Sequence, residues 1–340
     1  EYLARPHEKP QFILVGTYGP HFPYVAPPEL FYKYLKTARL PATFGTRDDF
    51  MNPVLCALQE PDIRPEVGLA CQAAYKGMVE HTDGLVGRVR RAFGAFVGGR
   101  RTPHLFGYLS DHGDTIGEHG VFGKKTFFEK SVKIPLLLAG TGVAAGRRWD
   151  EPVSILDVGP TVCAWAGAET PERADGQSLA SILRGEDGPR GRAVLSESMD
   201  KGPDGRWTYG CMARRGTYKF ITYHGYESQN MLFDVAADPL EQNNLAAARP
   251  GMCEEFRWLL RQATDPAAAE ALQAQHTKRA RVLAAFEKQT GYDDRERYRD
   301  YPEEAKRPPE VCVTSLVGGP GKEQSSVYHG LPLRPQEGKA

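Results

Sequence analysis

The sequence lacks the arrangements that mark several common classes of protein. Its six cysteines are scattered, with no Cys-x-x-Cys pair and no zinc-ligand spacing, so they predict no structural zinc site. No apolar run approaches the roughly 20 residues of a membrane span, and no secretory signal opens the chain. Lysine plus arginine and aspartate plus glutamate each number 43, so no bulk charge favours nucleic acid or an anionic membrane as a partner. We therefore expect a soluble protein whose compartment (cytoplasmic, periplasmic or secreted) composition leaves open.

The pattern of apolar residues predicts the fold class. Hydrophobic residues make up 41% of 340 positions, enough for one large core or a core with a smaller domain. Short continuous apolar runs at 12–16, 105–110 and 134–139 predict strands buried on both faces, as in a parallel sheet. Helical spacing over 67–97 and 154–168 predicts two helices between or after them. This alternation predicts an α/β fold with a mainly parallel sheet flanked by helices.

The pattern changes after residue 192. Short strands separated by turns predict a small antiparallel sheet, with strands at 193–197, 210–213, 218–223 and 231–234. Two helices are expected to follow, at 252–262 and 267–286. Beyond about residue 291 the sequence is rich in proline, glycine and charge, which predicts an extended or partly disordered tail. The predicted divisions are residues 1–190, 191–290 and 291–340.

The strongest chemical signal lies in residues 110–125. Asp111 and His112 directly follow a predicted buried strand, at the edge of an α/β sheet where functional groups collect. Gly113 permits the backbone turn that would let both side chains reach one ion. The alternative is an ordinary Asp-His-Gly turn with a solvated carboxylate, because short motifs often match by chance.

Two further residues are predicted to lie at the same edge of the sheet. Lys124 follows Asp111 by thirteen residues and would supply a second positive centre for an oxyanion. His21 lies in a proline-flanked loop directly after the first predicted strand. Either residue alone is ordinarily a surface lysine or a loop histidine. Because three separate signals converge on one edge, we interpret them together as a candidate site.

Zinc chemistry is less favoured for these residues. The segment that holds Asp111, His112, Glu118 and His119 contains no His-Glu-x-x-His helix, and its glycines predict a loop. No histidine in the chain has an aspartate or glutamate four residues before it, as a two-zinc phosphoesterase site would require. We therefore expect one metal ion. Glu118 and His119 are interpreted as a structural pair that holds the loop and orients His112.

The order of these motifs resembles the sulfatase family of the alkaline-phosphatase superfamily, with iduronate- and choline-sulfatase-like branches the most similar. The resemblance covers roughly residues 9 to 246. Its most specific parts are the Asp-His-Gly block with Lys124 and the Leu-Phe-Asp…Asp-Pro…Asn-Leu pattern at 232–245. The resemblance implies a calcium site, with Mg²⁺ or Mn²⁺ as alternatives, in which Asp111 and His112 are ligands. It also implies that Lys124 binds the sulfate and that His21 contacts the sulfate and donates a proton.

The sequence departs from the sulfatase family in one essential respect. Sulfatases use a formylglycine nucleophile made from cysteine or serine in a Cys-x-Pro-x-Arg setting, and no such motif occurs in this chain. The early Asp-Asp metal pair of the family is absent too, and both belong in a segment that would precede Glu1. The chain is therefore expected to be a fragment or cleaved piece, a partial gene product or a non-catalytic relative, and to be inactive by itself. Its expected partners are a sulfate ester (a small molecule or glycan) and the missing N-terminal segment. Phosphonate or phosphate ester hydrolysis, or a pseudo-sulfatase role, are the alternatives.

Overall fold

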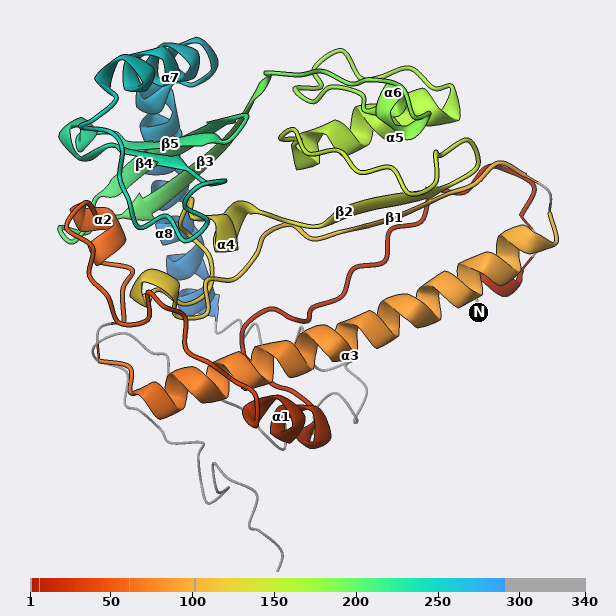
Figure 1. Ribbon diagram of the computed structural model, residues 1–340, viewed down its shortest axis with the longest axis horizontal. Helices are drawn as coiled ribbons and strands as arrows, with labels where there is room; N and C mark the ends of the chain where they lie inside the picture. Colours follow the sequence, from red (N-terminus) through yellow and green to blue (C-terminus); the bar gives the residue numbers. More distant parts are fainter. Residues whose placement is uncertain (1, 6, 61, 101, 291–340) are drawn as a thin grey trace, which may run out of the picture.

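A computed structural model of the protein describes residues 2–5, 7–60, 62–100 and 102–290. The N-terminal part is organised by one long helix, α3 (Pro65–Gly98), which confirms the helix predicted over 67–97. A proline at its first position fits there, because the first N–H groups of a helix have no partner within it. The helix α1 (Pro28–Leu35) packs against the first half of α3, and the buried residues of α3 end at Thr82 (Figure 1).

A two-stranded ribbon lies between α3 and the C-terminal part of the chain (Figure 1). Its strands are β1 (Leu105–Leu109) and β2 (Leu136–Gly140), which confirms two of the predicted strand positions. They pair antiparallel, with Leu105 opposite Gly140, so the parallel pairing expected from their apolar sequences is not formed between them. The physical reason is the connection between the strands. It leaves the end of β1 and enters β2 at the same end of the ribbon, whereas a parallel pair would need a crossover to the opposite end.

The strand predicted over residues 12–16 is not formed. This segment has no strand assignment, and all five of its residues are exposed, Phe12 by 80% and Leu14 by 83%. An apolar run becomes a buried strand only when other strands supply hydrogen-bond partners and packed layers cover its faces. No described strand pairs with this segment, so its apolar sequence alone does not make it a strand.

The C-terminal part contains the predicted small antiparallel sheet. Its four strands, in the order in which they pair, are β3 (Ala193–Lys201), β4 (Trp207–Arg215), β5 (Tyr218–Tyr223) and β6 (Met231–Asp234). Each strand pairs with its sequence neighbour. Gly216 has a φ of 60° in the two-residue connection between β4 and β5, a conformation that glycine adopts without strain. The prediction is confirmed, and β3 and β4 are longer than expected.

The two faces of this sheet bury different partners. On one face, Tyr209 and Cys211 of β4 pack with residues of α7 (Pro250–Ala263). On the other face, Met212 packs with Phe127 and Phe128, which lie in the connection between β1 and β2. This alternation along β4 is the two-residue period of a strand covered on both sides. The second face therefore joins the C-terminal sheet to the loop that follows Asp111.

The remaining helical segments are short, apart from one. They are η1 (Tyr2–Ala4), α2 (Pro53–Cys56), η2 (Glu118–Gly120), α4 (Glu129–Val132), η3 (Ile155–Asp157), α5 (Val158–Ala166), α6 (Ala180–Leu183), η4 (Glu227–Gln229) and α8 (Pro266–Thr290). Together η3 and α5 confirm the helix predicted over 154–168, and α7 and α8 confirm the two C-terminal helices.

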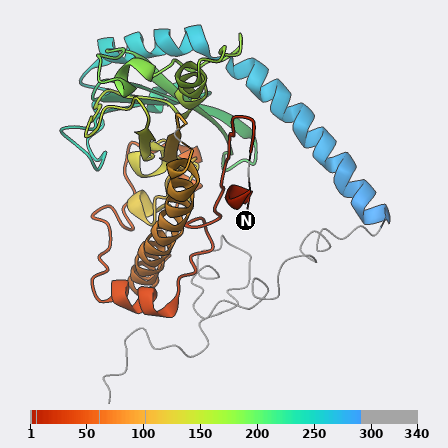
Figure 2. The ribbon, with the colours of Figure 1, turned by 90° about the vertical axis from the view of Figure 1, so that its right-hand side faces the viewer.

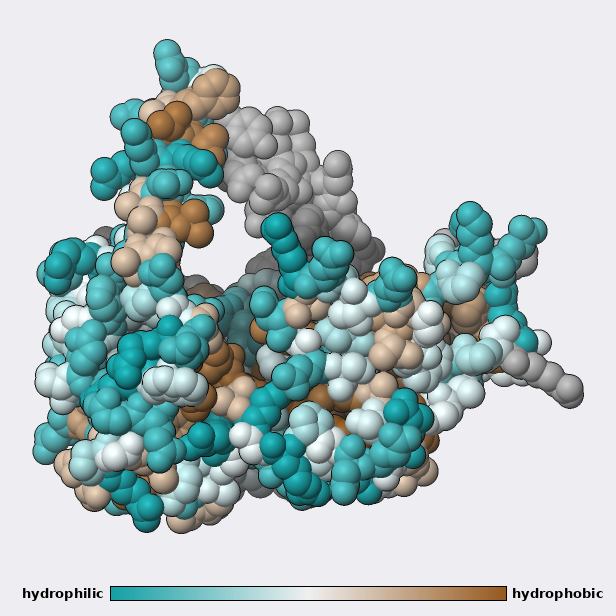
Figure 3. Space-filling model, turned by 90° about the horizontal axis from the view of Figure 1, so that it is seen from above, coloured by the Kyte–Doolittle hydropathy of each residue, from teal (hydrophilic) through white to brown (hydrophobic). Residues whose placement is uncertain are grey.

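The helix α8 projects away from the rest of the protein (Figure 2). It has no buried residue, and Leu272, Val282, Leu283 and Phe286 are all more than half exposed. Seen from above, apolar and polar side chains mix along this arm (Figure 3). No helix in the part of the chain that the structure describes is both long and apolar enough to cross a membrane. The tail predicted over 291–340 lies outside the described residues, and the predicted domain boundary near residue 190 stays a prediction.

Candidate active site

The structure brings the four predicted site residues together from three segments. The Lys124 Nζ atom lies 2.6 Å from the Nε2 atom of His21, a residue 103 positions earlier in the chain. The imidazole rings of His21 and His112 have centroids 5.8 Å apart and meet edge to face at 66°. Asp111 completes the group, because its Oδ2 atom lies 3.5 Å from the Nε2 atom of His112.

The hydrogen bonds of His21 define which of its nitrogens faces the site. Its Nδ1 atom lies within hydrogen-bond distance of the Phe22 carbonyl oxygen. A carbonyl oxygen only accepts, so Nδ1 carries the proton that it donates to Phe22. The Nε2 atom of the neutral ring is then an acceptor, which matches the hydrogen bond that Lys124 donates to it. An anion bound beside Lys124 would accept hydrogen bonds from its ammonium in place of His21.

His112 is held in the same tautomer. Its Nδ1 atom donates to the Gly113 carbonyl oxygen over 2.8 Å, which leaves the lone pair on Nε2. That lone pair faces the Asp111 Oδ2 atom, and a carboxylate oxygen is also an acceptor. A cation bound between these two acceptors, 3.5 Å apart, would be attracted by both. The Asp111 side chain is 83% exposed, so its oxygens are open to such a cation.

The described residues fit part of a divalent metal site. Carboxylate oxygen and imidazole nitrogen are suitable donors, and the Asp111 and His112 side chains present both. Calcium prefers six to eight oxygen ligands, whereas no group of three or more histidine, cysteine, aspartate or glutamate side chains gathers for a metal within the described ranges. These two residues therefore fit as ligands but do not complete a coordination sphere.

Gly113 matters for a different reason from the one that the sequence indicates. Its φ is not left-handed, so the turn after Asp111 does not depend on the conformational freedom of glycine. A Cβ atom at this position would lie 2.0 Å from the Lys130 carbonyl oxygen, and the Gly113 N–H donates to the Ser131 carbonyl over 2.7 Å. Only glycine permits this close approach of two backbones, which fixes His112 against the start of α4.

Asp114 holds the loop that leads to Lys124, a role that was not predicted from the sequence. Its Oδ1 atom accepts hydrogen bonds from the N–H groups of Ile116 and Gly123, both over 3.0 Å, and from the Tyr24 hydroxyl over 2.8 Å. Burial raises the pKa of this carboxyl, although the three donors act in the opposite direction. Asp114 thereby holds Gly123, the residue directly before Lys124, in place. An aspartate two residues before an accepted backbone N–H is an Asx-turn, and that pattern was the available signal.

The interpretation of Glu118 and His119 as a pair that orients His112 is wrong. His119 is buried, and its ring nitrogens contact the Asp48 carboxylate at 2.7 Å and the Leu240 carbonyl oxygen at 3.0 Å. Its ring also stacks on Phe128 with centroids 4.2 Å apart. Glu118 lies instead near Lys130, at 3.5 Å. His119 does hold the loop, but it does so through residues distant in sequence.

Comparison with known proteins places this site in a family. Residues 1–168 match the family described as Sulfatase, and residues 117–262 match the one described as N-sulphoglucosamine sulphohydrolase, C-terminal. Among solved structures, phosphonate monoester hydrolase SpPMH from Silicibacter pomeroyi superposes with a TM-score of 0.59 at 26% identity, over 72% of this chain and 54% of that one. The fold is therefore that of the alkaline-phosphatase superfamily. Within it, the chain belongs to the sulfatase family, whose members hydrolyse ester bonds.

Two curated relatives define the extent of the likeness. Arylsulfatase K of Danio rerio is 33% identical over 206 residues, which cover 57% of this chain and 37% of that protein. Choline-sulfatase of Rhizobium meliloti (strain 1021) is 31% identical over 252 residues, which cover 70% of this chain and 46% of that protein. The chain thus spans less than half the length of either relative. The predicted resemblance to sulfatases, choline-sulfatase included, is confirmed.

Proposed function

We propose that Lys124, His21, Asp111 and His112 form the sulfate-binding half of a sulfatase active site with one divalent metal ion. The observation that supports this most is the 2.6 Å contact between Lys124 and His21, with His112 beside them. The lysine beside the histidines at the Asp-His edge would supply positive charge and hydrogen-bond donors to a bound anion. That arrangement suits a tetrahedral anion better than a neutral substrate.

Each residue has a proposed part in ester hydrolysis. The Lys124 ammonium binds sulfate oxygens and neutralises charge that develops on the bridging oxygen as the ester bond breaks. His21 contacts the same group and, once protonated, donates a proton to the departing alkoxide. Asp111 and His112 hold a divalent cation, Ca²⁺ in the first instance and Mg²⁺ or Mn²⁺ as alternatives, which supplies Lewis-acid stabilisation when bound. The proposed substrates are sulfate esters of small molecules or glycans.

The nucleophile and the remaining ligands are proposed to come from polypeptide outside residues 1–340. The sequence has no cysteine or serine in the setting from which formylglycine is made. Apolar residues that a neighbouring layer would cover are open, with Leu14 exposed by 83% and Leu137 of β2 by 59%. In this proposal, these exposed apolar side chains are places where that polypeptide would pack.

This chain should therefore release no sulfate by itself. With 4-nitrophenyl sulfate and excess Ca²⁺, we expect product formation at the rate of the buffer blank, because the described site can bind and polarise the ester but cannot attack sulfur. The measurement is the absorbance of 4-nitrophenol, with the Lys124→Ala variant as the control for contaminating activity. Calcium-dependent turnover that disappears in that variant would show that these residues contain a nucleophile.

Calcium binding should be weak and should depend on Asp111. Two protein ligands predict a dissociation constant of about 10⁻⁴ to 10⁻³ M, the range of the weaker calcium modules. Asp111→Asn removes the carboxylate ligand proposed for this site and should reduce binding below detection in a calorimetric titration. Asp187→Asn is the matched control, because its side chain is 81% exposed and Asp111 is 83% exposed. Equal loss in both variants would mean that calcium binds the general surface charge.

Phosphonate ester hydrolysis is the second candidate, supported by the likeness to a phosphonate monoester hydrolase at 26% identity. Sulfate and phosphonate groups are stabilised by nearly the same arrangement of positive charge, so Lys124 and His21 could bind either group. Competition between inorganic sulfate and methylphosphonate for the chain separates them: tighter sulfate binding favours the sulfatase, and tighter methylphosphonate binding favours the alternative. A chain that binds neither anion and no calcium would be a non-catalytic relative.

A further inference from the structure

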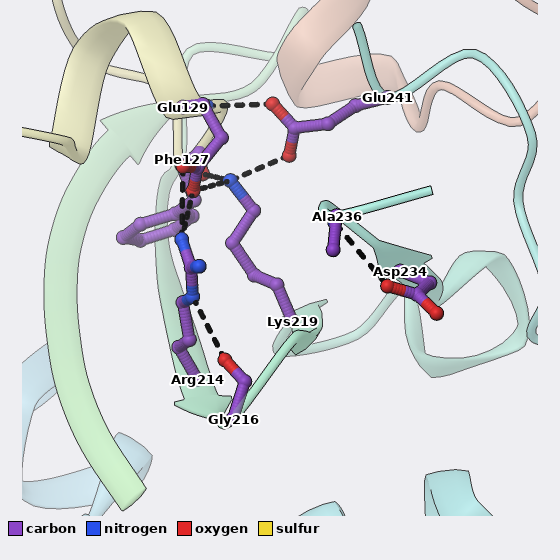
Figure 4. Close-up of polar contacts among 8 residues, drawn as sticks. All are labelled: Phe127, Glu129, Arg214, Gly216, Lys219, Asp234, Ala236 and Glu241. Carbon is purple, nitrogen blue, oxygen red and sulfur yellow. Dashed lines mark hydrogen bonds and ion pairs between the residues drawn. The ribbon is translucent and has the colours of Figure 1, made fainter. Parts of the chain in front are cut away.

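A largely buried cluster of four charged residues, Glu129, Arg214, Lys219 and Glu241, joins the C-terminal sheet to the segment that follows Lys124 (Figure 4). At its centre is Lys219 of β5, whose side chain is fully buried. Its ammonium donates to the Phe127 carbonyl oxygen over 2.8 Å and to the Glu129 Oε1 atom over 3.0 Å, and it forms an ion pair with Glu241. Two of the three donors of this ammonium thus make hydrogen bonds, and its contact with Glu241 is an ion pair.

The cluster is balanced in charge. Arg214 of β4 donates to both carboxylate oxygens of Glu129, over 2.9 and 2.8 Å, so two cations face two carboxylates. Burial alone would raise the pKa of Glu129, but Lys219 and Arg214 reverse this and hold it below its ordinary value. Burial raises the pKa of Glu241, against the opposing effect of Lys219. The hydrogen bonds and ion pairs of a charge-balanced cluster of this kind fix the positions of its members.

Glu241 takes part in the cluster despite a strained backbone conformation. Its φ of 54° is left-handed, a conformation that a non-glycine residue adopts only when its surroundings hold it there. In that conformation its Oε2 atom accepts a hydrogen bond of 2.6 Å from the N–H of Glu129. Lys219 of β5 thus contacts the side chain of Glu129, and Glu241 from the segment after β6 accepts a hydrogen bond from its backbone (Figure 4).

The contacts that hold Glu129 also constrain Lys124, because only a few buried residues separate the two. Residues 126–129 are all buried, with exposures from 2% to 9%, so they move little independently of the cluster. On the other side of Lys124, the N–H of Gly123 is bound to Asp114. Only Lys124 and Lys125 lie between these two fixed points. Lys125 has a φ of 87°, a strained value that this bracing maintains.

We propose that Lys219 is a positioning residue for Lys124: through Phe127 and Glu129 it holds the loop so that the Lys124 amine faces His21. The inference rests on the role proposed above for Lys124, and it adds that the C-terminal sheet sets the geometry of the anion site. Lys219 touches no substrate, so its effect is transmitted through the backbone.

The test is the chemical reactivity of Lys124 relative to Lys125. Lys124 is half-buried against His21 and Lys125 is exposed, so a trace amount of acetic anhydride should label Lys125 faster. Fragment-ion mass spectrometry of the peptide that contains both lysines gives the ratio directly. In Lys219→Met we expect the Lys124-to-Lys125 ratio to rise about fivefold, the change that corresponds to loss of one ordinary hydrogen bond. All variants are labelled at a temperature where each is folded.

Two further variants separate positioning from general destabilisation. Arg192→Met breaks a different buried ion pair, with Asp157, and should leave the ratio unchanged. The double variant Lys219→Met/Glu241→Gln restores the charge balance and should recover stability, yet its ratio should stay high because the bond to Phe127 is still missing. If Lys219→Met does not fold, the double variant provides the labelling test in its place.

Any of three results in the labelling ratios of the single variants and the wild type, or a fourth in the double variant, would overturn the proposal. They are an unchanged ratio in both Lys219 variants, an equal rise in Arg192→Met, or a wild-type ratio already near one. Recovery of the wild-type ratio together with stability in the double variant would reduce Lys219 to a structural residue. Failure of the wild-type chain to bind inorganic sulfate would contradict the proposed function and leave this ratio test intact.

Discussion

Replacing Lys219 with methionine should lower the free energy of unfolding by about 3–5 kcal/mol, the usual effect of removing one partner from a buried ion pair. Methionine has a similar length and fills the same space, so the loss comes from charge and not from a cavity. Glu129 and Glu241 would then share the cluster with Arg214 alone, leaving one buried negative charge without a partner. Net stabilities of domains are about 5–15 kcal/mol, so this single change could remove a large part of the total.

The loss should depend on pH. In the wild type the pKa of Glu129 is lowered, so its stabilisation is present above its ordinary pKa of 4.5 and disappears as the pH falls through the lower value in the folded state. In Lys219→Met the carboxylates lose their cation and take up protons more readily when folded. The difference between the two proteins should therefore be largest at neutral pH and shrink toward about pH 4.5.

Urea unfolding of both proteins at several pH values measures this effect. Lys130→Met is the control, because its side chain is 53% exposed and its pair with Glu118 should contribute at most about 1 kcal/mol. A loss in Lys219→Met no greater than in this control, or one that does not change with pH, would mean that the cluster does not stabilise the fold through its charges.

Replacing Lys124 with alanine should weaken the binding of inorganic sulfate by about 10- to 100-fold, since hydrogen bonds to charged groups contribute about 1.5–3 kcal/mol. The change removes the ammonium that contacts His21 and leaves the loop anchored at Asp114 and Phe127. Calorimetric titration with sulfate, in the presence of Ca²⁺, gives the affinity. The fold should be unaffected, because Lys124 is not part of an apolar core.

Lys125→Ala is the matched control for this prediction. It removes the same charge one residue away, on a side chain that points to solvent and has no hydrogen bond to His21. A weakening of twofold or less is expected from the lost surface charge, on the order of a weakly interacting exposed group. If both alanine variants weakened sulfate binding equally, the anion would be attracted by the overall charge of the loop and not held by Lys124.

The sequence predicted those elements whose signals are local. The long helix α3 and the strands of the C-terminal sheet were found because periodicity within each segment reports its own secondary structure. The segment at 12–16 was predicted as a strand, and β1 and β2 were assigned to a parallel sheet, on the same apolar signal. Strand pairing and its direction depend on distant segments, so composition within one segment does not determine them.

The candidate site divides in the same way. Asp111, His112, Lys124 and His21 were predicted because polar residues next to apolar runs stand out. Lys219 was not, because in the run Tyr-Lys-Phe-Ile-Thr-Tyr it has the appearance of a solvent-facing residue of an alternating strand. Its burial follows from partners about 20 and 90 residues away in sequence, contributed by other elements.

Asp114 and His119 show the same limit within the loop itself. Both lie inside the most informative stretch of the sequence, yet their partners Tyr24 and Asp48 come from the region before α3. Sequence spacing indicated that the loop is held, and it did not indicate by which residues. The residues that present the site were therefore predictable, whereas those that position it required the structure.

If His21 and Lys124, 103 residues apart, act on one bound anion, a double-mutant cycle on sulfate affinity should detect the interaction between them. Calorimetry on the wild type, His21→Ala, Lys124→Ala and the double variant, all with Ca²⁺, gives the interaction energy. We expect an interaction energy of about 0.5–3 kcal/mol, as for residues in contact. Strictly additive losses, or a wild-type chain with no measurable affinity for sulfate, would contradict it.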